Sequence, residues 1–101
     1  IINKLKKIKN YKLKKIGILG LAFKGETDDI RDSLAIKLLN KLKKLKLKIL
    51  TSDEYFKNEN NISKKQLINN SNIIIIGAPH NSYKKIKITK SKKLIDIWNI
   101  I

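Results

Sequence analysis

The sequence contains no cysteine and no methionine. The absence of cysteine excludes disulfide bonds and thiolate chemistry, and it is compatible with the cytoplasmic location that we expect. Because the chain opens at Ile1 with neither an initiator nor a signal peptide, we expect a fragment of a longer protein. The longest apolar run, residues 73–78, is far shorter than the roughly 20 residues of a membrane-spanning helix. No membrane partner is therefore expected.

Acidic residues and arginine are scarce. The 24 basic residues face only 8 acidic ones, which gives a net charge of +16. One interpretation is an electrostatic footprint for nucleic acid or anionic lipid. The other is the bias of an AT-rich genome, whose codons favour Lys, Ile and Asn. Arg31 is the only arginine and the lysines are spread along the chain, whereas nucleic-acid readers usually use arginine for bidentate contacts. The pattern favours the second interpretation, with no specific nucleic-acid partner.

Residues 1–14 are strongly basic, and Ile1, Leu5 and Ile8 fall on one helical face. Such a pattern is typical of a helix on a membrane surface. It is equally typical of a helix tail or linker whose apolar stripe packs on a core. We favour a helix tail or linker that feeds the first strand.

Residues 15–101 alternate between strand and helix patterns. Ser33 is a good N-cap for the clearest helix, and Ser63 with Gln66 fits a capping box. The predicted elements are a strand at 15–20, a helix at 34–45, a strand at 47–51, a short helix ending at 69–70, a strand at 73–76, a helical turn at 82–87 and a strand at 94–98. This order predicts an α/β fold, a three-layer Rossmann-like parallel sheet of four to five strands with helices on both faces.

In open parallel sheets, ligands bind beyond the carboxyl ends of the strands. The loop after the first predicted strand has neither the dinucleotide-binding G-x-G-x-x-G spacing nor a P-loop. It does offer Lys24, whose ammonium can meet a phosphate, and Phe23, which can wall or stack on a ring. The alternative is a solvated lysine beside a core phenylalanine, and composition alone favours that alternative.

The segment GILGLAFKGETDDIRDS resembles the signature of the carboxy-terminal domain of the UDP-glucose/GDP-mannose dehydrogenase family. The pattern is a strand ending in Leu-Gly, then Ala-Phe-Lys, then Thr-Asp-Asp-x-Arg, then Ser and a helix. Weaker similarities follow, at Asp53 after the next strand, at 73–78 with His80 and Tyr83, and at 94–99. The positions that carry the signature are Leu19, Gly20, Ala22, Phe23, Lys24, Thr27, Asp28, Asp29, Arg31 and Ser33. The resemblance covers residues 15–101.

The resemblance implies that residues 15–101 form the nucleotide-sugar-binding domain of an NAD-dependent enzyme. Enzymes of this family oxidise the C6 alcohol of a nucleotide sugar to a uronate in two hydride transfers. They bind NAD mainly in an amino-terminal domain, and they dimerise through a long central helix. The resemblance further implies that Lys24 contacts the UDP-sugar or related substrate, that Phe23 belongs to the same wall, and that Arg31 reaches NAD. For Arg31 the alternative is an ion pair with Asp28 or Asp29 that braces the loop.

Some family features are missing. The family nucleophile is a cysteine upstream of this domain, so we expect no catalytic residue here and no oxidation by this chain alone. A non-catalytic interaction fragment therefore remains an alternative. Trp98 occupies the place where some members have a substrate-contacting arginine, and the segment with His80 and Tyr83 looks more like members acting on N-acetylhexosamines.

Two polar residues near strand ends have competing interpretations. His80, the only histidine, follows Pro79, and we expect a structural role because no base or nucleophile partner is visible near it in the sequence. Asp96 is expected to close the last strand by binding loop amides. No metal-ligand spacing is present.

Overall fold

The computed structural model describes residues 2–22, 24–31, 33–57 and 59–101. Its centre is a sheet of four parallel strands in the order β2-β1-β3-β4. The strands are β1 (Ile16–Leu19), β2 (Ile49–Ser52), β3 (Ile73–Ile76) and β4 (Lys93–Asp96). The central position of β1 means that the chain first adds β2 on one side and then β3 and β4 on the other. The predicted α/β fold with a parallel sheet is confirmed.

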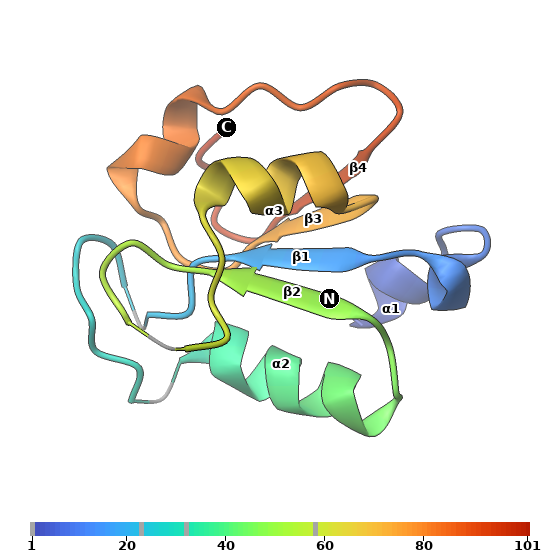
Figure 1. Cartoon of the computed structure of the whole chain (residues 1–101), viewed down its shortest axis with the longest axis horizontal. Helices are drawn as coiled ribbons and strands as arrows, with labels where there is room; N and C mark the ends of the chain where they lie inside the picture. Colours follow the sequence, from blue (N-terminus) through green and yellow to red (C-terminus); the bar gives the residue numbers. More distant parts are fainter. Residues whose placement is uncertain (1, 23, 32, 58) are drawn as a thin grey trace.

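Helices cover both faces of the sheet (Figure 1). Helix α2 (Leu34–Lys44) lies against one face, whereas α3 (Lys64–Asn70) and the 3-10 helix η2 (Asn81–Lys85) lie on the other. The short helix α1 (Ile2–Lys6) lies toward the amino ends of the strands, and the 3-10 turn η1 (Tyr11–Leu13) leads into β1. The three-layer arrangement leaves the carboxyl ends of the strands for loops.

Side-chain caps fix where the two long helices begin. The Ser33 hydroxyl accepts a hydrogen bond from the amide of Ile36 at 3.2 Å, and it donates one to the Leu21 carbonyl at 2.6 Å. At the start of α3, Ser63 and Gln66 form the predicted capping box. Both caps satisfy amides that have no partner inside the helix. The second bond of Ser33 also joins α2 to the loop that follows β1.

The core is divided by the sheet into two clusters, because successive strand residues point to opposite faces. Every residue of β1 and β3 is buried, as expected for strands covered on both sides. Leu5 of α1 is also fully buried, in the cluster on the α2 side. Whether residues 1–14 form a separate tail or linker stays a prediction. The α2-side cluster comprises Leu5, Ile16, Ile18, Leu21, Ala35, Leu38, Leu39, Leu42, Ile73, Ile75 and Ile95; the α3-side cluster comprises Leu19, Leu67, Ile74, Ile76 and Tyr83.

The bounds of β1, β2 and β4 differ from the sequence prediction by one or two residues, and two of these differences have a clear cause. β2 begins at Ile49 rather than at 47, because Lys46 has a left-handed backbone (φ 58°) and the chain is still turning out of α2. β4 ends at Asp96, so Trp98 lies outside the strand. There the Asp96 carboxylate accepts a bond from the Ile101 amide at 2.8 Å, and Asn99 turns the chain with φ 55°. The expectation that Asp96 closes the strand end is thus met.

We predict that Gly77→Ala destabilises the fold by about 2 kcal/mol, because overpacked sites typically cost 1–3 kcal/mol. A Cβ at Gly77 would collide with the Gly20 carbonyl oxygen and come within 2.8 Å of the Ala35 Cβ. Neither backbone nor a helix alanine can move aside easily. Urea unfolding followed by circular dichroism measures the change. The matched control is Leu13→Ala, whose side chain is 80% exposed and which should change stability by less than about 0.5 kcal/mol. Equal stability of the Gly77 variant and the wild type would contradict the close approach.

Candidate nucleotide site at the carboxyl ends of the strands

The loops after β1 and β2 are joined by the carboxylate of Asp53, the first residue after β2. The residue is only 6% exposed, and its side chain is fully buried. Its Oδ2 accepts bonds from the amides of Leu21 and Ala22 at 2.7 and 3.0 Å. Its Oδ1 accepts bonds from the amides of Tyr55 and Phe56 at 2.8 and 3.1 Å. Four backbone donors therefore converge on one buried carboxylate and hold two loops together.

The loop after β3 reaches the same carboxylate through His80. The His80 Nε2 lies 3.0 and 3.1 Å from the two oxygens of Asp53, and the ring is fully buried. On the other side of the ring, Nδ1 accepts a bond from the Glu26 amide at 2.9 Å. The rings of Tyr55 and Tyr83 pack against the imidazole with centroids 4.6 and 5.2 Å away. We call Asp53 and His80 together the Asp–His pair.

Electrostatics shift the pKa of both members of the Asp–His pair. Burial opposes ionisation of Asp53, but the bonds from His80 and from the backbone amides outweigh it and lower its pKa to about 2. Burial also opposes protonation of His80, but the hydrogen bond and negative charge of Asp53, together with Glu26, outweigh it and raise the His80 pKa. In its neutral form the ring donates from Nε2 to Asp53 and accepts at Nδ1 from Glu26. Protonation places a hydrogen on Nδ1, so the bond from the Glu26 amide requires the neutral ring, whereas the imidazolium faces the Glu26 carboxylate oxygen at 3.4 Å.

Lys24 lies on the loop after β1, at the place where the sequence predicts a ligand cation. Its side chain is exposed, and within the described parts of the chain it has no hydrogen bond or ion pair. The ammonium is therefore available to an anion. Phe23, predicted to be part of the same wall, lies outside the described residues.

Arg31 forms the ion pair that the alternative interpretation anticipated. Its Nε and Nη2 donate to the two carboxylate oxygens of Asp29 at 3.0 and 2.8 Å, and its side chain is 88% exposed. These bonds, and more weakly the charge of Lys24, lower the Asp29 pKa to about 2. Lys24 and Arg31 thus both act electrostatically on one carboxylate. A contact of Arg31 with NAD stays a prediction, because an exposed pair of this kind is easily exchanged for another partner.

Sequence reasoning missed the Asp–His pair. It found no partner for His80, whereas the structure places Asp53 beside it although 27 residues separate the two. The only signal was that Asp53 directly follows β2 and that His80 lies in the loop after β3, which brings both residues to one edge of a parallel sheet. Full burial of the imidazole agrees with the structural role expected for His80.

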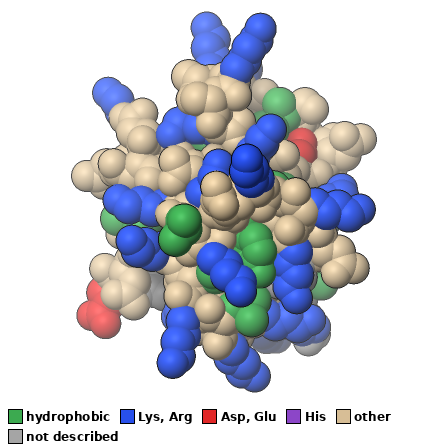
Figure 2. All heavy atoms as spheres, turned by 90° about the vertical axis from the view of Figure 1, so that its right-hand side faces the viewer, with side chains coloured by type: hydrophobic (Ala, Val, Ile, Leu, Met, Phe, Trp, Pro, Cys, Tyr) green, Lys and Arg blue, Asp and Glu red, His purple; other side chains and the backbone are tan. Residues whose placement is uncertain are grey.

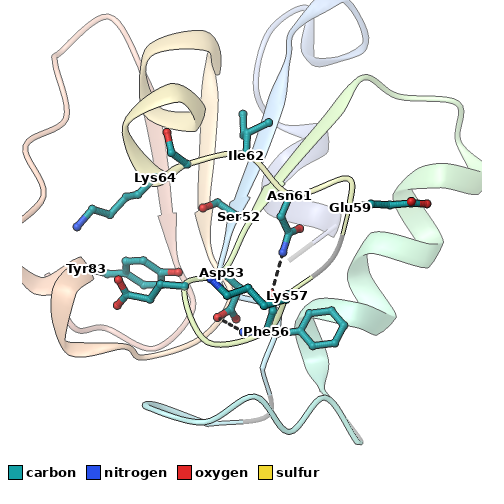
Figure 3. A pocket seen from close by; sticks show the side chains of 11 residues that line it. Ser52, Asp53, Phe56, Lys57, Glu59, Asn61, Ile62, Lys64 and Tyr83 are labelled. Carbon is teal, nitrogen blue, oxygen red and sulfur yellow. Dashed lines mark hydrogen bonds between the residues drawn. The ribbon is translucent and has the colours of Figure 1, made fainter.

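A cavity with a volume of about 650 Å³ lies beside this site. Figure 3 shows Tyr83 and Phe56 on opposite sides of Asp53, which forms part of the wall. Lys24 and Arg31 do not line the cavity. The volume of this cavity would suit a ligand. However, Lys24, the exposed cation of the signature segment, does not line it, so we place the candidate ligand site at Lys24. The lining residues are Ser52, Asp53, Glu54, Phe56, Lys57, Glu59, Asn61, Ile62, Ser63, Lys64 and Tyr83.

Two other kinds of site are absent from the described part of the chain. No group of three or more His, Cys, Asp or Glu side chains there is arranged to hold a metal ion. No helix there is both long and apolar enough to cross a membrane.

We predict that the titration of His80, the only histidine, has its midpoint above 6.5, because Asp53 and Glu26 stabilise the imidazolium. In Asp53→Asn the midpoint should fall, since the ring stays buried while its main counter-charge is lost. Proton NMR of the imidazole resonances measures both midpoints. Glu59→Gln, a carboxylate on the cavity wall, serves as the charge-matched control and should leave the midpoint unchanged. A wild-type midpoint below 6.5, or no response to Asp53→Asn, would contradict the stabilisation of the imidazolium by Asp53.

The chain matches known proteins over most of its length. Residues 17–101 match the description "UDP-glucose/GDP-mannose dehydrogenase family, UDP binding domain". The UDP-N-acetyl-D-mannosamine dehydrogenase of Pyrococcus horikoshii is 32% identical over 92 residues, which cover 85% of this chain and 22% of that protein. The enzyme of the same name from Methanocaldococcus jannaschii is 28% identical over 114 residues, which cover the whole chain and 26% of the relative. The chain therefore spans about a quarter of the length of these relatives.

Solved structures give the same result. The UDP-D-ManNAc dehydrogenase structure from Pyrococcus horikoshii superposes with a TM-score of 0.81 at 30% identity, covering 99% of this chain and 26% of that one. The GDP-mannose dehydrogenase from Pseudomonas aeruginosa superposes with a TM-score of 0.75 at 22% identity, covering 86% of this chain and 25% of that one, and supports the fold alone. The chain belongs to the UDP-glucose/GDP-mannose dehydrogenase family, and it corresponds to the UDP-binding domain of that family.

Proposed function

We propose that this chain is the substrate-binding domain of an NAD-dependent nucleotide-sugar 6-dehydrogenase, with Lys24 as the cation that meets the diphosphate of the substrate. One observation carries the proposal. Lys24 is exposed and unpaired among the described residues, and it lies on an anchored loop at the carboxyl ends of parallel strands. An ammonium in that place attracts a phosphate as a point charge.

The topology supports this location. The loop after β1 leads to α2 on one face, whereas the loop after β3 leads to η2 on the other (Figure 1). Ligands of open parallel sheets bind where neighbouring connections diverge in this way. Lys24 follows β1, and the Pro79–His80 segment follows β3, so the two loops flank that point.

Arg31 is the proposed contact to NAD, which would be bound mainly by an amino-terminal domain. Its guanidinium is exposed and held by Asp29 alone among the described acidic residues. Exchange of that exposed pair for a cofactor phosphate or carboxamide costs little free energy. Phe23 is proposed as part of the substrate wall because of its position in the signature segment.

The proposed reaction is that of the parent enzyme, not of this chain alone. It transfers two hydrides in succession from the C6 carbon of a nucleotide sugar to two NAD molecules, and one water molecule supplies the second oxygen of the resulting carboxylate while the protons pass to solvent. The chain has no cysteine to act as the nucleophile. We propose that the parent is a cytoplasmic homodimer whose amino-terminal domain supplies the nucleophile and holds NAD.

The relatives favour one class of sugar. Both sequence relatives are UDP-N-acetyl-D-mannosamine dehydrogenases. Trp98, which is 37% exposed, stands after β4 where some family members have a substrate-contacting arginine, and its indole nitrogen donates to the Gly77 carbonyl at 3.0 Å. Because the indole N–H of Trp98 already donates to a backbone carbonyl, it cannot replace the substrate contact that an arginine makes at this place. We therefore propose a UDP-N-acetylhexosamine as the substrate class.

We predict that UDP perturbs the NMR resonances around Lys24 at millimolar concentration, and that Lys24→Gln weakens this binding about tenfold, which corresponds to about 1.4 kcal/mol. The matched control is Lys12→Gln, because Lys12 lies in η1 before the start of β1. That variant should bind UDP as the wild type does. No perturbation near Lys24 in the wild type, or equal weakening by both variants, would contradict the proposal.

A second candidate function, binding of nucleic acid without sequence specificity, is favoured by the charge distribution. All described acidic residues follow β1 or β2 or end β4, and Figure 2 shows many lysines and few acids on the face at the amino ends of the strands. Lysine-only patches bind phosphate backbones non-specifically and with strong salt dependence. Fluorescence anisotropy with a DNA duplex separates the two candidates: affinity that vanishes at physiological salt leaves only the dehydrogenase function.

A further inference from the structure

The segment that carries Lys24 is fastened on both sides of this residue. Before it, the amides of Leu21 and Ala22 donate to Asp53. After it, the amide of Glu26 donates to the His80 Nδ1 at 2.9 Å. Only one residue separates Ala22 from Lys24, and only one separates Lys24 from Glu26, so the backbone of Lys24 has little freedom between these anchors.

Contacts with the loop after β3 reinforce the second anchor. The Glu26 carboxylate accepts a bond from the Asn81 amide at 2.8 Å. The backbone at Gly25 approaches so closely that a Cβ there would lie 2.7 Å from the Pro79 carbonyl oxygen. Glu26 itself has a left-handed backbone (φ 52°), a conformation that costs free energy and persists only when its surroundings impose it. The bond to His80 is one of the contacts that impose it.

Both anchors end on the Asp–His pair, which cannot itself touch a ligand. The His80 side chain is fully buried, and so is the side chain of Asp53. The rings of Tyr55 and Tyr83 also pack against the imidazole. Any influence of the pair on a bound nucleotide must therefore pass through the loop that the pair holds.

We propose that Asp53 and His80 are positioning residues that fix the Lys24 loop for binding of the substrate diphosphate, with the His80–Glu26 bond as the critical anchor. This inference rests on the proposed function, because it takes Lys24 as the diphosphate-binding group. A loop ordered before the ligand arrives avoids the free-energy cost of ordering during binding. Loss of an anchor should thus weaken binding even when the fold survives.

Two substitutions of His80 distinguish loss of the bond to Glu26 from a general loss of stability, because each keeps one of the two hydrogen bonds of the ring. In His80→Asn the side-chain oxygen takes the place of Nδ1 and still accepts the Glu26 amide, but the contact with Asp53 is lost. In His80→Gln the side-chain nitrogen takes the place of Nε2 and still donates to Asp53, but the Glu26 amide loses its acceptor. Ile74→Val, in the buried strand β3 on the α3 side, is the control for a modest loss of stability that does not touch the loop.

UDP affinity of the 101-residue chain is measured by NMR titration for the wild type and these three variants, at a pH above the His80 midpoint where the neutral ring accepts at Nδ1, and thermal unfolding is recorded alongside. We expect about tenfold weaker binding for His80→Gln, equivalent to the loss of one hydrogen bond to a fixed loop. His80→Asn should recover most of the affinity, and Ile74→Val should bind as the wild type does. Wild-type affinity in His80→Gln, or equal weakening in both His80 variants, overturns the positioning role and leaves the proposed function intact. Failure of the wild type to bind UDP overturns the proposed function and the positioning role with it.

A measurement on the wild type covers the case in which a His80 variant does not fold. Amide hydrogen exchange should show slow exchange for Leu21, Ala22 and Glu26 and faster exchange for Lys24, whose amide has no described acceptor. Exchange of the Glu26 amide as fast as that of Lys24 would overturn the proposed anchor.

Discussion

The buried carboxylate of Asp53 joins three loops that are far apart in the sequence. Burying a carboxylate is costly unless hydrogen-bond donors and a counter-charge replace its water. Here four backbone amides and one imidazole do so. Because the pKa of Asp53 is lowered to about 2, the ionised form contributes roughly 2 kcal/mol to stability above the unfolded value of 3.8. That contribution is lost as the pH falls from about 4 to about 2, when the carboxylate becomes protonated.

The position of Asp53 connects the fold to the proposed function. The sheet order β2-β1-β3-β4 brings the end of β2 next to the end of β1 and within reach of the loop after β3. The carboxylate therefore organises the rim of the sheet on which a ligand of this fold would bind. Lys24 contributes an exposed charge to that rim, while the Asp–His pair contributes order without exposure. In this account Lys24 binds the ligand, and the Asp–His pair holds the loop of Lys24 in position.

The elements that could be predicted from the sequence are those determined by interactions between residues close together in the chain. Helix α2 followed from its apolar spacing and the Ser33 cap, α3 from its capping box, and β3 from a continuous β-branched run. The start of β2 and the end of β4 were misplaced, because the left-handed backbone conformations of Lys46 and Asn99 leave no apolar pattern in the sequence. The boundary errors therefore arise where single backbone conformations decide the outcome.

The candidate site was predictable only in part. The signature segment located Lys24 and Arg31 on one loop, and the ion pair of Arg31 with Asp29 was foreseen as an alternative. The Asp–His pair was not foreseen, because it depends on the order of strands that are not neighbours in the sequence. Strand ends that carry single polar residues were the only hint. The cavity near Phe56 has no sequence signal either, since its walls come from β2, the following loop and η2.

The most direct test of the account is a crystal structure of the chain soaked with UDP. We expect the diphosphate beside the Lys24 ammonium, with the bonds that Asp53 accepts from the amides of Leu21 and Ala22 and from His80 unchanged. A nucleotide seated instead in the cavity between Phe56 and Tyr83, away from Lys24, would contradict the account.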